Sequence, residues 1–545
     1  MESRRHQIFP SLTEDQFAIL QRYGERRHIP AGTVLFTQGQ RHIDMVVVLA
    51  GKIEISRGTA ISSHVIGTHG PGSFTGEAGT LAGRAAIATG RAITDCDVIV
   101  IEEAALRTLV IAEADLSETI MRAYILRRMA FIEDQAGGLI LLGSQDDAET
   151  LGLRSFLTRN GHPTAYFDIH LHPESASLLA RFAIDVADTP AVVLSTGAVF
   201  RRPTIRALAD ATGISPDKME GRTFDVVVVG AGPGGLAAAV YAASEGLNVA
   251  VLERAAPGGQ AGTSSKIENY FGFPTGISGQ ALAGRGLSQA RKFGAEVAVP
   301  VLAVKVDCGG HNVDGFAITL DNDETIHART IVVATGARYR KPPLPDLARY
   351  EGRGIYYSAA FMEATFCKDE EIVVVGGGNS AGQAAVFLSR FARHVHVCVR
   401  GPGLGATMSH YLVQRIDAAP NITLHAHTEV CALHGDGHLD GVELCTGDAP
   451  PVRVPVRHLF LFLGAEPNTD WLNACVALDD KQFVLTGADV PRSTWCSARA
   501  PHPLETSRPG IFAVGDVRSG SVKRVAAAVG EGAAAVQSLH QVLAL

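Results

Sequence analysis

The sequence predicts a multidomain chain: a small all-β barrel or jelly roll with helices, then a small α/β domain, then a larger α/β module. Its 545 residues are too many for one hydrophobic core. In residues 1–135, short apolar runs such as "GTVLFTQGQ" and "DCDVIVIE" alternate with glycine turns, which is typical of barrel strands, and residues 115–134 have a helical pattern. After residue 223, the pattern strand, glycine turn, helix, strand occurs twice, which predicts two parallel α/β units.

Composition excludes several classes of protein. With 46% hydrophobic and 19% charged residues the chain is expected to be globular, and its formal net charge of -8 argues against a nucleic-acid surface. No basic run suggests a membrane surface, no stretch of about 18 apolar residues could span a bilayer, and the N-terminus lacks the apolar core of a secretory signal. The eight cysteines are scattered without a C-x-x-C pair, so we expect neither a metal site nor a local redox dithiol, and we expect a cytoplasmic protein.

Residues 1–135 resemble the cyclic-nucleotide-binding domain through "PAGTVLFTQGQ", "VVVLAGKIEI" and "GSFTGEAGTLAG". In that family a Gly-Glu pair, here Gly76 and Glu77, opens a phosphate-binding cassette, and the glutamate accepts a hydrogen bond from the ribose 2'-hydroxyl. The family's phosphate-pairing arginine is replaced by Ala86, with Arg84 and Arg91 nearby. The resemblance implies a cyclic-nucleotide site at Gly76, Glu77 and Arg84; the alternative is a degenerate cassette that serves as a structural module.

Residues 138–215 predict the order strand, helix, strand, helix, strand, strand, helix. The segment "DTPAVVLSTGAVFRRP" resembles the cis-proline hairpin of the thioredoxin and glutaredoxin fold, with Pro190 as that proline. Such proteins carry reactive cysteines between the first strand and helix, where this chain has "GSQDDAET". We therefore expect a spacer or docking platform, because thiol exchange needs a nucleophile that this segment lacks.

The segment "TFDVVVVGAGPGGLAAAVYAASEGLNVAVLER" reads as strand, glycine turn, helix, strand. Gly230, Gly232 and Gly235 take the places of a G-x-G-x-x-G motif: the first permits the tight turn, the second lets a pyrophosphate approach, and the third lets the helix pack on the strand. Glu253 closes the second strand about 20 residues on, where a carboxylate can accept from an adenosine ribose. This stretch therefore predicts a dinucleotide site.

Two further segments, "PGGQAGTSSKIENYFGFP" (257–274) and "GIFAVGDVRSGSVKRVAAAVGEGAAAV" (510–536), resemble the low-molecular-weight thioredoxin reductase family, which is class II of the pyridine nucleotide-disulfide oxidoreductases. The resemblance implies that Gly259, Gln260 and Asn269 line the flavin of FAD and that Asp516 holds a ribityl hydroxyl. The helix after Arg524 would point its positive N-terminal end at the isoalloxazine and favour the anionic reduced flavin.

A second dinucleotide fold is predicted by "EEIVVVGGGNSAGQAAVFLSRFARHVHVCVRG". Gly376, Gly378 and Ala381 take the motif places, and Ser380 lies in the same turn. The end of its second strand carries Arg400 rather than an acid, so we expect NADPH, with NADH as the alternative. The expected division of the third block is 223–337 and 458–545 for FAD, with 338–457 inserted for NAD(P)H.

The family's two redox cysteines fall at Ala359 and Met362, and its acid falls at Glu363. Alanine and methionine cannot exchange with a disulfide, because exchange needs an attacking thiolate. Cys367, five residues beyond Met362, stands alone and is expected to be a packed or surface thiol.

These patterns predict an FAD-dependent oxidoreductase that takes hydride from NADPH and passes electrons to an unidentified acceptor. Candidates are a quinone, oxygen, a ferredoxin-like carrier, or a protein docked on the middle domain. No side chain is assigned as a catalytic acid or base, and the resemblance implies a homodimer whose nucleotide domains rotate. Two alternatives stay open: a thioredoxin-disulfide reductase that uses distant cysteines, and a redox or cyclic-nucleotide sensor that controls a partner.

Overall fold

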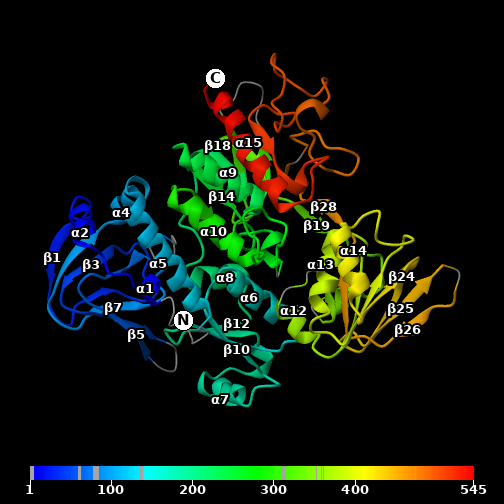
Figure 1. Cartoon of the computed structure of the whole chain (residues 1–545), viewed down its shortest axis with the longest axis horizontal. Coiled ribbons are helices and arrows are strands. Elements are labelled where there is room, and N and C mark those ends of the chain that lie inside the picture. Colours follow the sequence, from blue (N-terminus) through cyan, green and yellow to red (C-terminus); the bar gives the residue numbers. More distant parts are fainter. Residues whose placement is uncertain are drawn as a thin grey trace.

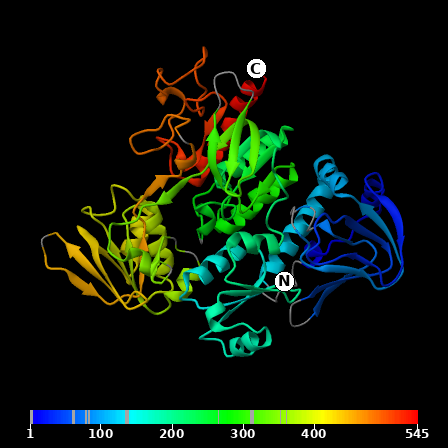
Figure 2. The ribbon, with the colours of Figure 1, turned by 180° about the vertical axis from the view of Figure 1, so that it is seen from behind.

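The computed structural model arranges the chain as four compact regions (Figure 1). It describes residues 5–58, 63–77, 81, 85–133, 139–264, 266–308, 315–351, 353–357, 359, 361–447, 449–472 and 474–544. The middle domain lies between the N-terminal domain and the inserted nucleotide domain, and the view from behind shows the same order (Figure 2). None of the described helices is long and apolar enough to cross a membrane.

The N-terminal domain consists of two antiparallel four-stranded sheets and flanking helices, which is the jelly-roll form of the predicted barrel. The sheets have the orders β1-β8-β3-β6 and β2-β7-β4-β5. Helix α5 is the predicted helix of residues 115–134, and with α4 it packs Leu109 and Ile120 against Met45 and Phe74 of the first sheet. The elements are α1 (Arg5–Ile8), α2 (Glu14–Leu20), β1 (Glu25–Ile29), β2 (Val34–Phe36), β3 (Met45–Ala50), β4 (Ile53–Gly58), β5 (Ser63–His69), β6 (Phe74–Thr75), β7 (Thr89–Ala92), β8 (Cys96–Ile101), α4 (Glu103–Ala112) and α5 (Ala114–Glu133).

The middle domain has a four-stranded sheet of order β10-β9-β11-β12, in which β9 and β10 are parallel and β11 is antiparallel to both of its neighbours. This follows the element order expected from the sequence, and the peptide bond before Pro190 is cis, as the predicted hairpin requires. Its elements are β9 (Leu139–Gly143), α6 (Ala148–Arg159), β10 (Thr164–Asp168), α7 (Glu174–Arg181), β11 (Ala191–Val193), β12 (Val199–Arg201) and α8 (Ile205–Ala211).

The first nucleotide domain is built on a sheet of order β15-β14-β13-β18-β17-β16, with β29 parallel to β18. In β13, Val226 and Val228 face helices α9, α10 and α15, whereas Val227 and Val229 face the opposite layer. Because both faces are covered, the strand is a continuous apolar run. The elements are β13 (Thr223–Val229), α9 (Pro233–Ser244), β14 (Val249–Leu252), α10 (Gly279–Lys292), β15 (Glu296–Ala298), β16 (Ala303–Asp307), β17 (Phe316–Leu320), β18 (Thr325–Val333), β29 (Ile511–Ala513) and α15 (Val525–Leu543).

The inserted nucleotide domain has a parallel sheet of order β20-β27-β21-β22-β23 and a separate antiparallel sheet β24-β25-β26. The expected boundary at residue 457 is too early, because β27 pairs with β21 inside this sheet. The chain returns through β28, which pairs with β19 at the entrance to the domain. The elements are β19 (Ala337–Tyr339), α11 (Leu347–Tyr350), β20 (Ile355–Tyr356), α12 (Phe361–Phe366), β21 (Glu371–Val375), α13 (Asn379–Leu388), β22 (His394–Cys398), α14 (His410–Ala418), β23 (Ile422–His425), β24 (Thr428–His434), β25 (Gly441–Thr446), β26 (Val452–Val454), β27 (His458–Leu461) and β28 (Ala465–Pro467).

The middle domain and the first nucleotide domain share one hydrophobic core. Phe156 and Leu157 of α6 and Leu208 of α8 belong to the same buried cluster as Leu236 of α9 and Leu287 of α10. The middle segment was expected to be a spacer or docking platform, and a spacer would not share a core. The two regions therefore form one packed unit.

Candidate functional site

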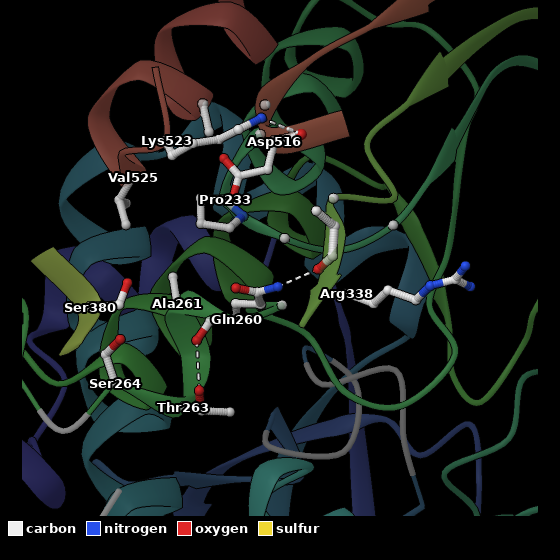
Figure 3. Close-up of a pocket in the computed structure, with 18 of the residues that line it drawn as sticks. Pro233, Gln260, Ala261, Thr263, Ser264, Arg338, Ser380, Asp516, Lys523 and Val525 are labelled. Atoms are coloured by element: carbon white, nitrogen blue, oxygen red, sulfur yellow. Dashed lines mark hydrogen bonds between the residues drawn. The ribbon is translucent and has the colours of Figure 1, made fainter. Parts of the chain in front are cut away.

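One cavity of about 920 Å³ contains most of the predicted cofactor residues. Figure 3 shows Gln260, Ser380, Asp516 and Lys523 around it. A cavity of this size is within the range of sites for large cofactors. The predicted residues that line it are Gly230, Gly232, Glu253, Gly259, Gln260, Asn269, Ser380, Asp516 and Arg524.

The first glycine turn has the geometry that its motif predicts. Gly230 has φ +107°, and a Cβ there would lie 2.3 Å from the Ala334 carbonyl oxygen. A Cβ on Gly235 would lie 1.9 Å from the Gly230 carbonyl oxygen, so only glycine lets α9 approach the turn. Gly232 caps α9, and a Cβ there would meet nothing within 4 Å, which leaves a hollow at the helix start. The turn therefore leaves room for a diphosphate at the N-terminus of α9.

Glu253 ties the turn to the loop that follows β14. Its Oε2 accepts from the Ala231 amide at 2.9 Å and its Oε1 accepts from the Ala255 amide at 2.9 Å. The side chain is buried but still borders the cavity. On the loop beyond it, Gln260 donates to the Ala337 carbonyl and thereby joins the loop to β19.

The C-terminal segment closes another side of the cavity. Burial raises the pKa of Asp516, an effect that Lys523 opposes and Glu531 reinforces. Lys523 donates to the Asp516 carbonyl oxygen, and burial lowers the pKa of Lys523. Arg524 is the N-cap residue of α15 and also lines the cavity.

The second glycine turn has a similar backbone but lies mostly outside this cavity. Gly376 has φ +142°, and a Cβ there would lie 2.5 Å from the Phe462 carbonyl oxygen. Gly378 caps α13 and has open space around it, and Ala381 is fully buried. Arg400 is exposed just after β22. Of the second-site predictions, only Ser380 lines the cavity; Gly376, Gly378, Ala381 and Arg400 do not, and neither does Gly235 of the first site.

The cavity lining is positively charged although the whole chain has a formal net charge of -8. Among the described residues that line it, eight are Lys or Arg and four are Asp or Glu. Such a balance favours an anionic ligand. One cation that sequence reasoning missed is Arg159, which reaches the cavity from the middle domain and lies in no recognisable motif.

No thiol replaces the family's cysteines at their usual place in the described residues. Ala359 lines the cavity, while the side chain of Met362 lies outside the described part. Cys367 is fully buried and donates to the Glu363 carbonyl oxygen at 3.1 Å. Burial, with Glu370 and Glu363 nearby, raises its pKa to about 12. It is therefore a packed thiol rather than a nucleophile.

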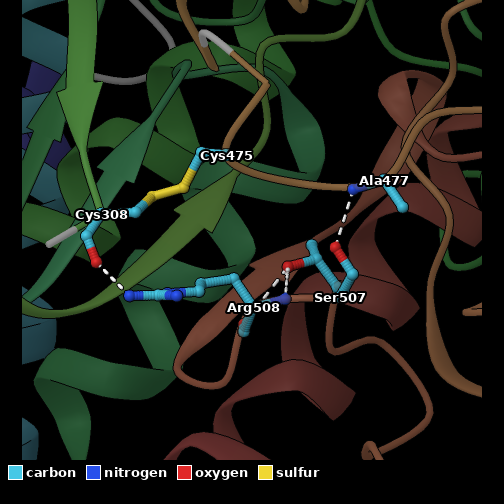
Figure 4. The surroundings of a disulfide bond; sticks show 6 residues. Cys308, Cys475, Ala477, Ser507 and Arg508 are labelled. Carbon is cyan, nitrogen blue, oxygen red and sulfur yellow. Dashed lines mark hydrogen bonds between the residues drawn. A yellow bond between two sulfur atoms is a disulfide. The ribbon is translucent and has the colours of Figure 1, made fainter. Parts of the chain in front are cut away.

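Four of the eight cysteines are paired, which their scattered spacing did not indicate. Cys308 is bonded to Cys475 across 167 residues, with Cα atoms 6.1 Å apart (Figure 4). Cys431 is bonded to Cys445 between β24 and β25, with Cα atoms 6.0 Å apart. The expectation of single cysteines is therefore wrong for these four, because the fold places Cys308, just after β16, against Cys475, and the pairing of β24 with β25 brings Cys431 to Cys445. Neither Cys308 nor Cys475 lines the cavity.

The predicted cyclic-nucleotide cassette contains a buried ion pair. Gly76 has φ +90°, and a Cβ there would lie 2.2 Å from the Asp44 carbonyl oxygen. Glu77 is 1% exposed, and its Oε1 accepts from Nη1 of Arg127 on α5 at 2.7 Å. Arg84, the third predicted residue, lies outside the described residues. Arg127 is thus the partner that sequence reasoning missed, and it joins the cassette to α5.

A buried histidine close to Arg127, His69, makes the N-terminal domain sensitive to acid. Burial, and then the nearby Arg127, lowers the His69 pKa from 6.5 to about 3. Below pH 6.5 the imidazole of His69 is protonated in the unfolded chain but stays neutral in the folded domain. The free energy of unfolding of the domain therefore falls as the pH falls from 6.5 towards 3. At pH 4.5 this costs about 3 kcal/mol. Hydrogen exchange of the backbone amides of β4 and β5, measured at pH 7 and at pH 4.5, tests this. The drop in protection between the two pH values should be larger in the wild type than in His69→Gln, and an equal drop would contradict the role of His69.

Comparisons with known proteins agree with this arrangement. Residues 224–532 match the family described as pyridine nucleotide-disulphide oxidoreductase, and residues 26–113 match the cyclic nucleotide-binding domain. Thioredoxin reductases of Listeria monocytogenes and Streptomyces clavuligerus are each 33% identical, over 325 and 323 residues; each match covers 59% of this chain and 94% of the relative.

Solved structures give the same result. Thioredoxin reductase from T. acidophilum is 30% identical with a TM-score of 0.52, and that from Lactococcus lactis is 28% identical with a TM-score of 0.53. They cover 59% of this chain and 98% and 99% of their own chains. With its cavity between two glycine-turn domains and a family match over more than half of its length, the chain is a thioredoxin-reductase-like member of the pyridine nucleotide-disulphide oxidoreductase family, with an N-terminal cyclic nucleotide-binding domain.

Proposed function

We propose that the protein takes hydride from NADPH onto FAD and passes the electrons to an acceptor other than a thiol pair at the family's usual place. The cavity is the observation that supports this proposal most. It is bordered by Gly232 at the start of α9 and by Ser380 in the first turn of α13. A flavin that exchanges hydride with a nicotinamide needs its two nucleotide domains to meet in this way.

In this proposal FAD occupies the cavity. The fit is supported by the hollow at Gly232 and by the positive lining. Glu253 would bind the adenosine ribose, and Asp516 would bind a ribityl hydroxyl. The other residues proposed to hold FAD are Gly230, Gly235, Gly259, Gln260, Asn269 and Arg524.

The second glycine turn would bind the nicotinamide nucleotide. Gly376, Gly378, Ser380 and Ala381 would form the diphosphate turn. Arg400 follows β22 and is exposed, so its guanidinium is accessible to a ribose phosphate. This favours NADPH over NADH.

The electron acceptor would be a molecule other than a thiol at the family's usual place. Ala359 leaves the cavity wall without a thiol, and the high pKa of Cys367 keeps that sulfur protonated at neutral pH. Electrons would therefore leave the flavin directly for a quinone, oxygen, a ferredoxin-like carrier or a docked protein. A second candidate function, disulfide reduction through distant cysteines, is favoured by the Cys308–Cys475 bond.

Anaerobic titration of the purified protein with NADPH separates these functions. We expect one hydride equivalent per bound flavin, because neither Cys308 nor Cys475 lines the cavity. The matched control is the double variant Cys308→Ser/Cys475→Ser, which should take up the same amount. If the wild type takes up two equivalents and the variant one, the disulfide reductase function replaces our first proposal. The same titration with NADH tests the nucleotide preference, and a protein without flavin contradicts both functions.

The N-terminal domain would regulate this activity. Arg127 occupies Oε1 of Glu77, whereas Oε2 of the same carboxylate has no partner among the described residues, so a ribose hydroxyl would bind beside Arg127 and link the nucleotide to α5. A sensor that controls a partner protein is the alternative use of this domain. We further propose a homodimer, as the family resemblance implies, and keep the cytoplasmic location as a proposal that rests on the N-terminal sequence and no longer on unpaired cysteines.

A further inference from the structure

The middle domain contributes directly to the wall of the main cavity. Helix α6 begins after Asp147, whose carboxylate accepts from the Thr150 amide at 2.9 Å, and it ends at Arg159. Its apolar side, including Phe156 and Leu157, is buried in the core shared with α9 and α10. The C-terminal end of α6 is therefore held against α9 and α10 of the first nucleotide domain by this shared core.

Two consecutive residues at this end hold the loop that follows Glu253. Arg159 Nη2 donates to the Gly259 carbonyl oxygen at 3.1 Å and lies 3.5 Å from that of Ala256. Asn160, which is 2% exposed, donates through Nδ2 to the Ala255 carbonyl oxygen at 2.9 Å. Three carbonyls of one loop thus bind side chains from another domain.

This loop lies beside the first glycine turn. A Cβ on Gly259 would lie 3.1 Å from the Cα of Gly232, so the two backbones are in close contact. Arg159, Gly232 and Gly259 all line the cavity. The guanidinium of Arg159 therefore borders the part of the cavity where the turn leaves room for a diphosphate, and a planar cationic fork suits that anion.

We propose that Arg159 completes the FAD site: it fixes the Ala255–Gln260 loop and provides a positive charge to the ADP half of the cofactor. This inference rests on the proposed function. The matched relatives show why the shared fold does not require this residue. The family match begins at residue 224, and the Listeria relative is covered over 94% of its length by 325 residues of this chain. It therefore has no room for a domain equivalent to residues 138–215, and the middle domain adds a contact that this relative lacks.

The test measures binding of FAD and of ADP to the apoprotein, the first by flavin fluorescence and the second by calorimetry. Arg159→Gln should weaken both by about tenfold or more, because a charge-assisted contact is lost. Arg202→Gln is the matched control: the same substitution on the middle domain, at an exposed arginine that pairs with Glu149 at 2.9 Å and does not line the cavity. It should leave both dissociation constants unchanged.

Arg159→Lys keeps the positive charge but loses the planar fork of guanidinium donors. Compared with Arg159→Gln, it should therefore recover part of the affinity for FAD and ADP and part of the salt dependence of that affinity. Arg159→Lys also replaces the glutamine variant in the test if that variant does not fold. In that case its dissociation constants for FAD and ADP should be higher than those of the wild type by about threefold or more. Equal binding of FAD and ADP by wild type and the folded Arg159 variants would overturn the inference. A wild-type protein that binds no FAD would instead contradict the proposed function.

Discussion

Gly235→Ala is expected to give a protein that retains no FAD and unfolds far more easily than the wild type. The added Cβ would lie 1.9 Å from the Gly230 carbonyl oxygen and 3.1 Å from the Ala334 Cβ. Since backbone cannot yield as a flexible side chain does, α9 must move away from β13, and the turn loses its shape. Overpacking of this kind costs several kcal/mol. Flavin absorbance per protein and thermal unfolding of the holoenzyme measure both effects.

Gly284→Ala is the matched control. Gly284 lies on the exposed side of α10, and a Cβ there meets nothing within 4 Å. Alanine in a helix interior is favoured over glycine by about 0.5–1 kcal/mol, so this variant should keep its flavin and become slightly more stable. If Gly235→Ala kept its full flavin content, the close approach of α9 to the turn at Gly230 would not be needed to bind FAD, which would contradict this prediction.

Arg127→Ala should destabilise the N-terminal domain by about 3–5 kcal/mol. The substitution leaves Glu77 buried at 1% exposure without its cation. It also removes the donors to the Ile8 carbonyl at 2.9 Å and the Phe74 carbonyl at 3.1 Å. The loss can be measured within the intact protein, because the backbone amides of β3 and β8 should exchange their hydrogens faster in the variant than in the wild type.

Arg122→Ala on the same helix provides the comparison, because Arg122 pairs with Glu118 at the exposed surface and such pairs contribute about 0–1 kcal/mol. The double variant Glu77→Gln/Arg127→Met should recover much of the lost stability, since it leaves no buried charge. Exchange rates in Arg127→Ala that match those in Arg122→Ala would mean that the buried pair contributes nothing.

The parts of the fold and site that could be predicted are those carried by local patterns. Gly230, Gly232 and Glu253 lie in one strand-turn-helix-strand unit, so spacing alone placed them around one cavity. The boundary at residue 457 was wrong because "HLFLFLG" is equally apolar in either sheet, and only pairing with β21 assigns it.

Contacts between distant segments could not be predicted in the same way. Glu77 and Arg127 are on different elements, and nothing in the α5 pattern indicates which buried carboxylate its arginine meets. Likewise, the apolar side of α6 has the same pattern whether it covers its own sheet or a neighbouring domain. Arg159 reaches the cavity only because α6 packs against the neighbouring nucleotide domain.

The shared core also determines how the chain must be made. Synthesis proceeds from the N-terminus, and α8 ends at Ala211 whereas α10 ends at Lys292. At about 5–20 residues per second, the middle domain leaves the ribosome on the order of ten seconds before α9 and α10 can cover Phe156 and Leu208. During that interval its apolar side is open to aggregation and to chaperones. A nascent chain released before Lys292 would never bury that side, so a fragment in which the middle domain is fully packed must extend through α10.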